Sequence, residues 1–345
     1  MAKKHFLIDI PHPHFVHFFR NLIDRLGRDN VLLTCQRSRM IVDLLNRTGL
    51  EYVTIGPKYR GLVAKAFGQS VYLARYLRLI RENDIHCVLG MSPAVAMAAK
   101  VTRKKMFFFD DDDSSVQPVS KRFTVPLSDH VITPRCLAFE KYGRKHHTYA
   151  GYQELAYLAP AVFTPDICVI RRYCLEPGNY FVVRWNEFKA HHDVGRGGIP
   201  KALKRRLIRL LEPEGRILIT SEYELDSEYS QYRISINPLD IHHVLAYARM
   251  LVGDSQTMSA EAAVLGTPAI RCNSFKGRIA YLNELERVYH LTYSFSPYEG
   301  EAMLEQVRIL LREEGLREIW QQRREAMLSE MEDVNQFIYD LVMRV

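Results

Sequence analysis

The alternation of short apolar runs with longer amphipathic segments constrains the fold of this chain more than any other feature of its sequence. Near the start, "HFLIDI", "VLLTC" and "YVTIG" have the length and apolar character of strands. Between them, "HFVHFFRNLIDRLG" and "SRMIVDLLNRTG" repeat their apolar residues with the period of a helix. Because parallel strands need crossover connections, this order predicts a parallel sheet covered by helices on both faces.

The same pattern occurs twice along the chain. It runs from residue 1 to about 165 and starts again near residue 178 with "YFVVRW" and "RILIT". A stretch with three prolines and little periodicity, "APAVFTPDICVIRRYCLEPGN", separates the two series. A chain of 345 residues is also too long for one ordinary core. We therefore expect an α/β protein with two doubly wound, Rossmann-like domains, at residues 1–165 and 178–325, that face each other across a cleft.

Composition limits the possible partners and the compartment. The 47 basic and 40 acidic residues give a net charge of +7, which favours a surface or site that meets anions. Phosphate, nucleic acid and an acidic bilayer all qualify, but no nucleic-acid-binding motif or basic tail is present, so nucleic acid is not an expected partner. The six scattered cysteines show no metal-binding spacing and fit a reducing cytoplasm. No signal peptide or membrane span is expected.

One basic segment leaves membrane contact open. "KYRGLVAKAFGQSVYLARYLRLIREN" mixes lysine and arginine with apolar and tyrosine positions, as does a helix that rests on an anionic bilayer. An ordinary basic amphipathic helix on the protein surface explains the same pattern. We therefore expect a cytoplasmic protein, with peripheral contact at the inner face of the membrane as an alternative.

The turn "GDSQTMSAE" is the strongest candidate for a binding site. Ligands of open α/β sheets bind beyond the carboxyl ends of the strands, and here the strand "MLVG" ends at Gly253. A helix is expected to start near Ser255, and its unpaired N–H groups, with the Thr257 hydroxyl, are suited to a phosphate. The alternative is that Asp254 or Ser255 is an ordinary helix cap and Glu261 a solvated or capping carboxylate.

Histidines and aspartates at other strand ends are candidates for proton transfer. Asp9 ends the first strand, and His12 and His14 follow it, with His14 nearest to the start of the helix. His192 and Asp193, after the first strand of the second domain, could transfer a proton or bind phosphate. For each histidine a structural role, such as capping a backbone group, is the alternative.

Further strand-end residues complete the predicted site. In "FDDDDSS" neighbouring carboxylates of an extended chain point opposite ways, so a solvated or hydrogen-bonding turn that includes Asp110 is expected rather than a magnesium site. Neither a metal nor another cofactor is predicted. Ser92 and Glu222 lie in other strand-end loops. Arg184 and Arg271 end strands of the second domain and could neutralise a diphosphate, or form surface ion pairs.

The turn resembles a known signature. Non-hydrolysing UDP-N-acetylglucosamine 2-epimerases, which have the two-domain GT-B architecture, carry the pattern D-S-G-G-x-x-E-E-A, and this chain reads D-S-Q-T-M-S-A-E-A. The resemblance implies that Ser255, Gln256 and Thr257 bind a diphosphate through backbone amides. It implies that Glu261 holds the ribose hydroxyls. Gln256 and Thr257 replace the glycine pair, which changes how closely a phosphate approaches the backbone.

A second resemblance covers nearly the whole chain. "IDIPHPHFVHFFRNLI", "GYQELAYLAP", "VVRWNEFKAHHDVGRGG", "ILITSE", "GDSQTMSAEAAVLGTPAIRCNSFKG" and "YLNELE" resemble successive blocks of the family called domain of unknown function 354, which is described as GT-B-like. The resemblance implies that residues 1–165 form the acceptor side and residues 178–325 the nucleotide-sugar side. It also implies that a C-terminal helix at residues 326–345 packs back onto the first domain.

These observations predict a GT-B-type glycosyltransferase. It would move a sugar from a nucleotide-diphosphate donor, expected to be UDP-linked, to a glycan or lipid-linked acceptor in surface polysaccharide or glycoconjugate synthesis. His14 or a neighbour would take the acceptor proton while helix-end amides and Arg271 stabilise the departing diphosphate. One alternative is a UDP-sugar 2-epimerase, in which His192, Asp193 and Glu222 would carry more of the chemistry. Another is a non-catalytic nucleotide-sugar-binding protein.

Overall fold

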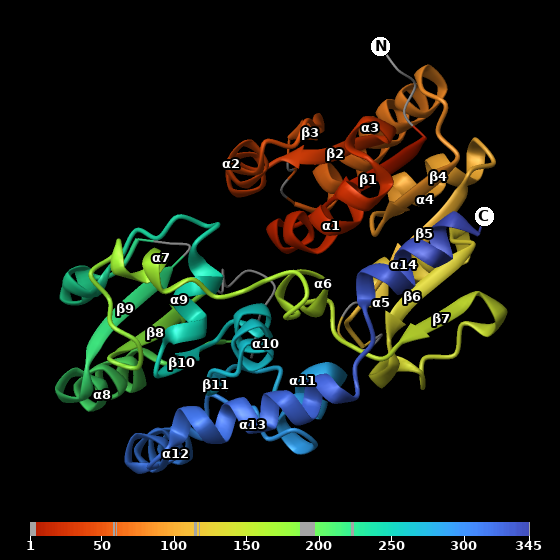
Figure 1. The fold of residues 1–345 in the computed structure, drawn as a ribbon. Helices are drawn as coiled ribbons and strands as arrows, with labels where there is room; N and C mark the ends of the chain where they lie inside the picture. The colour runs from red at the N-terminus through yellow and green to blue at the C-terminus, as the bar shows by residue number, and fades with distance from the viewer. Residues whose placement is uncertain are drawn as a thin grey trace. The chain divides into compact units, whose positions relative to one another are not determined.

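The computed structural model divides into two compact units. The first unit consists of Met1–Tyr157 and Glu332–Val345, and the second consists of Leu158–Met331. Each unit is built around its own parallel sheet (Figure 1). The structure describes residues 5–57, 59, 61–113, 116, 118–186, 197–221 and 224–344.

The sheet of the first unit has seven parallel strands in the order β3-β2-β1-β4-β5-β6-β7. The strand order reverses between β1 and β4, and such a switch point is where open α/β sheets bind ligands. Most strand residues are buried, as expected for a sheet with both faces covered. The strands are β1 (Phe6–Ile10), β2 (Val31–Arg37), β3 (Val53–Pro57), β4 (Cys87–Gly90), β5 (Lys105–Phe109), β6 (His130–Pro134) and β7 (His146–Tyr149).

Helices connect these strands and supply much of the core. Phe18 and Phe19 of the first helix pack edge-on against Phe109 of β5, and all three side chains are buried. Short 3₁₀ helices lie at Arg28–Asn30, Val125–Leu127, Arg135–Leu137 and Gly143–Lys145. The α-helices are α1 (Pro13–Leu26), α2 (Arg39–Thr48), α3 (Leu62–Glu82), α4 (Pro93–Val101), α5 (Pro118–Thr124), α6 (Leu155–Leu158) and α14 (Val334–Met343).

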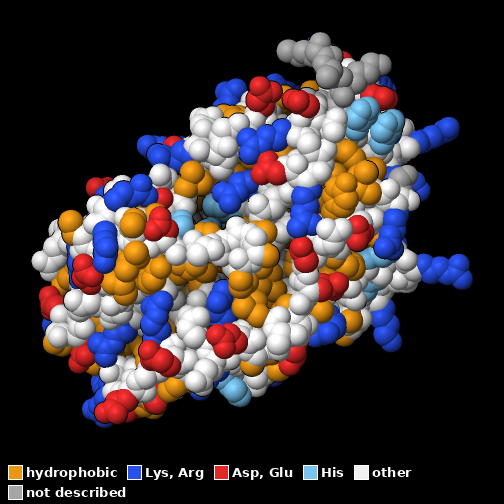
Figure 2. Space-filling model, in the orientation of Figure 1, with side chains coloured by type: hydrophobic (Ala, Val, Ile, Leu, Met, Phe, Trp, Pro, Cys, Tyr) orange, Lys and Arg blue, Asp and Glu red, His pale blue; other side chains and the backbone are white. Residues whose placement is uncertain are grey.

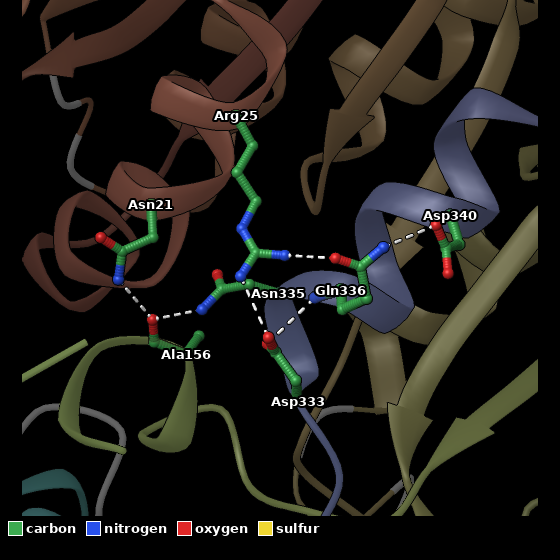
Figure 3. A network of polar contacts seen from close by, with 7 residues as sticks. All are labelled: Asn21, Arg25, Ala156, Asp333, Asn335, Gln336 and Asp340. Carbon is green, nitrogen blue, oxygen red and sulfur yellow. Dashed lines mark hydrogen bonds and ion pairs between the residues drawn. The ribbon is translucent and has the colours of Figure 1, made fainter. Parts of the chain in front are cut away.

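The last helix, α14, belongs to the first unit although it follows the second unit in sequence. Arg25 of α1 donates a 3.0 Å hydrogen bond to Asp333, just before α14 (Figure 3). Asn21 and Asn335 both donate to the carbonyl oxygen of Ala156, at 2.7 and 2.8 Å. The C-terminal segment is therefore fixed to α1 and to the end of the first unit by polar contacts from three separate parts of the chain.

The sheet of the second unit has five parallel strands in the order β12-β11-β10-β8-β9, with β10 at its centre. The prediction of an α/β fold with two Rossmann-like domains is confirmed. The strands are β8 (Tyr180–Trp185), β9 (Arg216–Ser221), β10 (Met250–Gly253), β11 (Ala269–Cys272) and β12 (Thr292–Phe295). The helices are α7 (Ile167–Arg171), α8 (Lys201–Leu211), α9 (Ile241–Tyr247), α10 (Gln256–Leu265), α11 (Ala280–Arg287), α12 (Gly300–Arg312) and α13 (Leu316–Ser329), with 3₁₀ helices at Glu212–Glu214 and Ser227–Tyr232.

Two surface properties bear on possible partners. Within the described residues, none of the helices combines the length and the apolar character needed to cross a bilayer. On the face drawn in Figure 2, lysine and arginine side chains are spread among aspartates and glutamates rather than gathered into one basic field. The net charge of +7 is therefore not concentrated on that face.

Candidate functional site

The turn from β10 to α10 has the geometry of a helix N-terminus at the carboxyl end of a central strand. Ser255 is the N-cap of α10, and its side-chain oxygen accepts a 3.3 Å hydrogen bond from the amide of Met258. Gly253 is needed where β10 approaches β8, because a Cβ at this position would lie 2.4 Å from the carbonyl oxygen of Arg184. Gln256 and Thr257 open the first turn, where helix amides have no intrahelical partner.

A buried polar network fixes this turn to its neighbouring strands. Asp254 is 2% exposed and accepts a 2.7 Å hydrogen bond from the backbone amide of Asn186, after β8. Burial raises the pKa of Asp254 to about 6. Asn273, after β11, donates to the carbonyl oxygen of Asp254 at 2.8 Å. The ends of three adjacent strands are therefore joined through Asp254.

The two predicted arginines lie one residue before the ends of the strands on either side of β10. Arg184 in β8 donates to the side chain of Asn186 at 3.0 Å, and Arg271 in β11 donates to the side chain of Asn273 at 3.0 Å. Arg271 is 2% exposed, and burial lowers its pKa. Both guanidinium groups thus donate to side-chain amides, which help to orient them. The two asparagines are site residues that the sequence pattern did not indicate.

Glu261 lies inside α10 and is buried. Its carboxylate accepts from Nε2 of His242, in α9, at 3.0 Å, and both residues are less than a tenth exposed. The carboxylate therefore contributes to the interior of the second unit, whether or not it also contacts a ligand. His242 was not among the predicted residues, because nothing in the sequence relates it to Glu261.

In the first unit, Asp9 lies at the switch point between β1 and β4. It is 2% exposed and accepts hydrogen bonds from the hydroxyls of Tyr76 at 2.6 Å, Ser92 at 3.1 Å and Thr34 at 3.3 Å. Burial raises the pKa of Asp9 to about 6, although the three hydroxyls act in the opposite direction. Asp9 and Ser92, both predicted, are thus brought together.

The two predicted histidines of the first unit have different environments. The exposed His12 is the N-cap of α1, and its ring accepts from the amide of His14 at 3.4 Å. His14 is 9% exposed, and its ring nitrogens contact the side-chain oxygen of Gln153 at 2.9 Å and the hydroxyl of Tyr157 at 3.1 Å. Since the amide oxygen only accepts, Nε2 of His14 donates to Gln153, and in the neutral ring Nδ1 accepts from Tyr157.

A group of neighbouring carboxyls, of which Asp110 is buried and Asp111 half-buried, lies at the carboxyl end of β5. Asp110 is 2% exposed and forms a 2.7 Å ion pair with the buried Lys121, and burial raises its pKa to about 6. The pKa of Asp111 is raised well above its ordinary value by burial, with repulsion from Asp112 and Glu154. The turn that includes Asp110 is thus held by an ion pair, and the pKa values of Asp110 and Asp111 are both raised.

The end of β7 faces the same carboxyls. Glu154 is 1% exposed, and so is Tyr149, whose hydroxyl has no hydrogen-bond partner among the described residues. Burial and the nearby Asp111 and Glu154 raise the pKa of Tyr149. Asp111, Tyr149 and Glu154 are candidate residues that the sequence analysis did not identify. His192, Asp193 and Glu222 lie outside the described residues.

The chain thus has an α/β fold with two Rossmann-like units, each with a candidate site at the carboxyl ends of its strands, and structures with a similar fold are GT-B proteins. It belongs to the family described as protein of unknown function (DUF354), whose model matches residues 5–344. No curated protein matches the chain in sequence.

Solved structures share this fold at low sequence identity. UDP-GlcNAc 2-epimerase from Neisseria meningitidis bound to UDP-GlcNAc is 11% identical, with a TM-score of 0.69 over 99% of this chain and 100% of that one. UDP-N-acetylglucosamine 2-epimerase from Rickettsia bellii is 14% identical, with a TM-score of 0.67 over 100% and 99% of the two chains. MurG from Acinetobacter baumannii is 14% identical, with a TM-score of 0.58 over 99% and 100%.

Proposed function

We propose that this protein is a nucleotide-sugar-dependent enzyme whose second unit binds the donor at the turn between β10 and α10. The observation that carries the proposal is the position of Arg184 and Arg271 on the strands flanking β10, beside the N-terminus of a ten-residue helix. Helix-end amides and guanidinium groups are the donors that a diphosphate requires. The similarity to a 2-epimerase bound to UDP-GlcNAc supports a UDP-linked donor.

Glycosyl transfer to a glycan or lipid-linked acceptor is the reaction that we propose first. The acceptor oxygen forms a bond to the anomeric carbon as the bond from that carbon to the diphosphate breaks. The acceptor proton passes to Nδ1 of His14 through the hydroxyl of Tyr157, which lies 3.1 Å away. The amides of the first turn of α10 and the Arg271 guanidinium stabilise the departing diphosphate.

A cytoplasmic location, with peripheral membrane contact as an alternative, stays a prediction.

A specific observation also favours the second candidate, 2-epimerisation of a UDP-sugar. Elimination and re-addition of the nucleotide need groups that take up and release protons near neutral pH. Asp110, whose pKa burial raises to about 6, has this property, and the pKa of the adjacent Asp111 is also raised. In this reaction the buried carboxyls of the first unit, rather than His14, would carry the proton transfers.

Incubation with UDP-sugars distinguishes these reactions. Free UDP formed only with an acceptor indicates transfer, whereas an isomeric UDP-sugar formed without acceptor indicates epimerisation. In the first case His14→Ala should lower turnover at least about a hundredfold and leave UDP affinity unchanged. If the reaction is epimerisation, Asp111→Asn should lower turnover at least about a hundredfold and leave UDP affinity unchanged. UDP-sugar binding without either product would leave only the non-catalytic binding role, and absence of nucleotide binding would contradict the proposal.

A further inference from the structure

Two histidines and an aspartate meet at the amino ends of β1 and β4, at the opposite end of the sheet from the candidate site. His5 precedes β1, and Asp84 and His86 precede β4. The backbone that carries them is fixed, because the amide of His86 donates to the carbonyl of His5 at 2.8 Å and the amide of His5 donates to the carbonyl of Asn30 at 2.8 Å. The three side chains therefore project from one end of the sheet, where hydrogen bonds fix the backbone. A fixed backbone suits a binding site that requires precise ligand positions.

The side chains are arranged around one carboxylate oxygen. Nδ1 of His5 lies 3.9 Å and Nε2 of His86 lies 3.8 Å from Oδ2 of Asp84. The two imidazole rings are nearly parallel, with an interplanar angle of 6° and centroids 5.2 Å apart. The three donor atoms all lie within 4.8 Å of one another. These separations are too long for hydrogen bonds between the side chains, but they leave room for an ion that all three would contact.

We propose that His5, Asp84 and His86 bind a Zn²⁺ ion. Two imidazoles and a carboxylate are zinc ligands, and bond lengths of about 2.0 to 2.2 Å in a tetrahedron place donor atoms roughly 3.3 to 3.5 Å apart. Small side-chain rotations therefore complete the site. The three ligand side chains are accessible to an ion in solution, because those of His5, Asp84 and His86 are 39%, 48% and 60% exposed. A water molecule takes the fourth position.

Binding has a defined structural consequence. Nδ1 of His5 lies 3.3 Å from the carbonyl oxygen of Asp84, and a zinc ion on Nδ1 replaces this contact. The ion then joins the start of β1 to the turn before β4, so it stabilises the folded first unit by mass action. Within the described parts of the chain, no other group of three or more such ligands occurs, so a single ion is expected there. The site is independent of the nucleotide-sugar proposal.

Calorimetric titration of the full, tag-free chain with Zn²⁺ tests this proposal. We expect one Zn²⁺ per chain and a rise in the unfolding temperature with Zn²⁺ concentration. His86→Gln and Asp84→Asn should each weaken binding at least about tenfold, since removal of even an outer partner of a metal ligand costs about that much. His290→Asn is the matched control, because His290 is exposed and has a positive φ of 53°, which asparagine tolerates.

A second readout locates the ion without relying on affinity. In NMR spectra that correlate ring protons with ring nitrogens, Zn²⁺ should shift the nitrogens of His5 and His86 and leave those of His290 unchanged. The unfolding temperatures of the metal-free variants show whether each variant folds. Zn²⁺ affinity that is equal in wild type, His86→Gln and Asp84→Asn, or no binding by the wild type, would overturn the proposal. UDP affinity is measured on the same variants and is expected to stay unchanged.

Discussion

Asp9 and Asp254 occupy comparable places in the two units but are held differently. Each lies at the end of a central parallel strand, is 2% exposed and has a pKa raised to about 6 by burial. Asp9 accepts from three side-chain hydroxyls, of Tyr76, Ser92 and Thr34, whereas the carboxylate of Asp254 accepts from the backbone amide of Asn186.

The difference suggests different roles for the two carboxyls. A hydroxyl both donates and accepts, so the partners of Asp9 can reorient when it takes up a proton. A backbone amide only donates. Asp254 therefore keeps the hydrogen bond from Asn186 only if the oxygen in that bond remains an acceptor. The hydrogen bonds of Asp9 can thus rearrange when it takes up a proton, whereas the bond that holds Asp254 keeps a single direction. The single direction at Asp254 suits the turn that we propose to bind the donor.

The largest effect on folding is expected at Gly253. An alanine Cβ there would lie 2.4 Å from the carbonyl oxygen of Arg184, so the backbones of β8 and β10 would have to separate. At Gly90, which ends β4, a Cβ would lie 3.0 Å from Cβ of Asp9 and 3.1 Å from a methyl of Val95. Gly253→Ala should destabilise the second unit by about 3 kcal/mol or more, and Gly90→Ala the first unit by about 1 kcal/mol.

Hydrogen exchange of the amides in β10 and β4 measures the stability of each unit separately. Equal losses in the two glycine variants would mean that the turn after β10 is no more rigid than its counterpart after β4.

The next largest effect is a pH dependence that arises from Asp9. Its pKa is raised from 3.8 to about 6, so the folded chain holds this proton more tightly than the unfolded chain does. The resulting stability is fully present below pH 3.8 and is lost as pH rises to about 6, a decrease of about 3 kcal/mol. Asp9→Asn should remove this decrease from the unfolding free energy measured between pH 4 and 7.

Asp254→Asn is the matched variant, because the pKa of Asp254 is raised to about the same value. It should flatten the same pH range by a similar amount. If the curve of Asp9→Asn parallels that of wild type, burial does not raise the pKa of Asp9, and the similarity between the two carboxyls is incorrect.

A smaller difference in the free energy of unfolding is expected between variants that remove the partners of the buried His242 and His14. Glu261→Ala removes a carboxylate from Nε2 of His242, and Gln153→Ala removes a neutral amide from Nε2 of His14. Hydrogen bonds to charged groups contribute more, so we expect losses of about 2 kcal/mol and about 1 kcal/mol in urea unfolding. Glu261→Gln retains an acceptor for His242 and should be intermediate. A loss in Gln153→Ala that exceeds the loss in Glu261→Ala would contradict this ranking.

The sequence predicted the fold because its signal is local. Strand and helix periods, the helix start near Ser255 and the strand ends at Asp9 and Gly253 all depend on neighbouring residues. The bonds that give these residues their properties are not local. Tyr76 reaches Asp9 across 67 positions, and Asn186 reaches Asp254 across 68. No pattern in the sequence indicates such pairs.

Only part of the candidate site could be predicted, again because the sequence shows local patterns and not long-range contacts. The turn at Ser255 followed from a strand-to-helix transition, which is a contiguous motif. Glu154 was missed because its importance comes from burial beside Asp111, and burial of a carboxylate contradicts the ordinary expectation that it is solvated. Likewise, the proposed zinc ligands His5 and His86 follow no sequence spacing, since parallel pairing of β1 with β4 brings them together.

The central claim, that the N-terminus of α10 binds a nucleotide diphosphate, is tested most directly by the affinity of Thr257→Glu for UDP. Thr257 is the second residue of α10, where a carboxylate favours the free helix through its dipole, so the variant should be no less stable than wild type. The added charge repels a diphosphate, and UDP affinity should fall at least about tenfold. Ala202→Glu, at the second residue of α8, is the control and should bind UDP as wild type does. UDP affinity in Thr257→Glu equal to wild type would contradict the account.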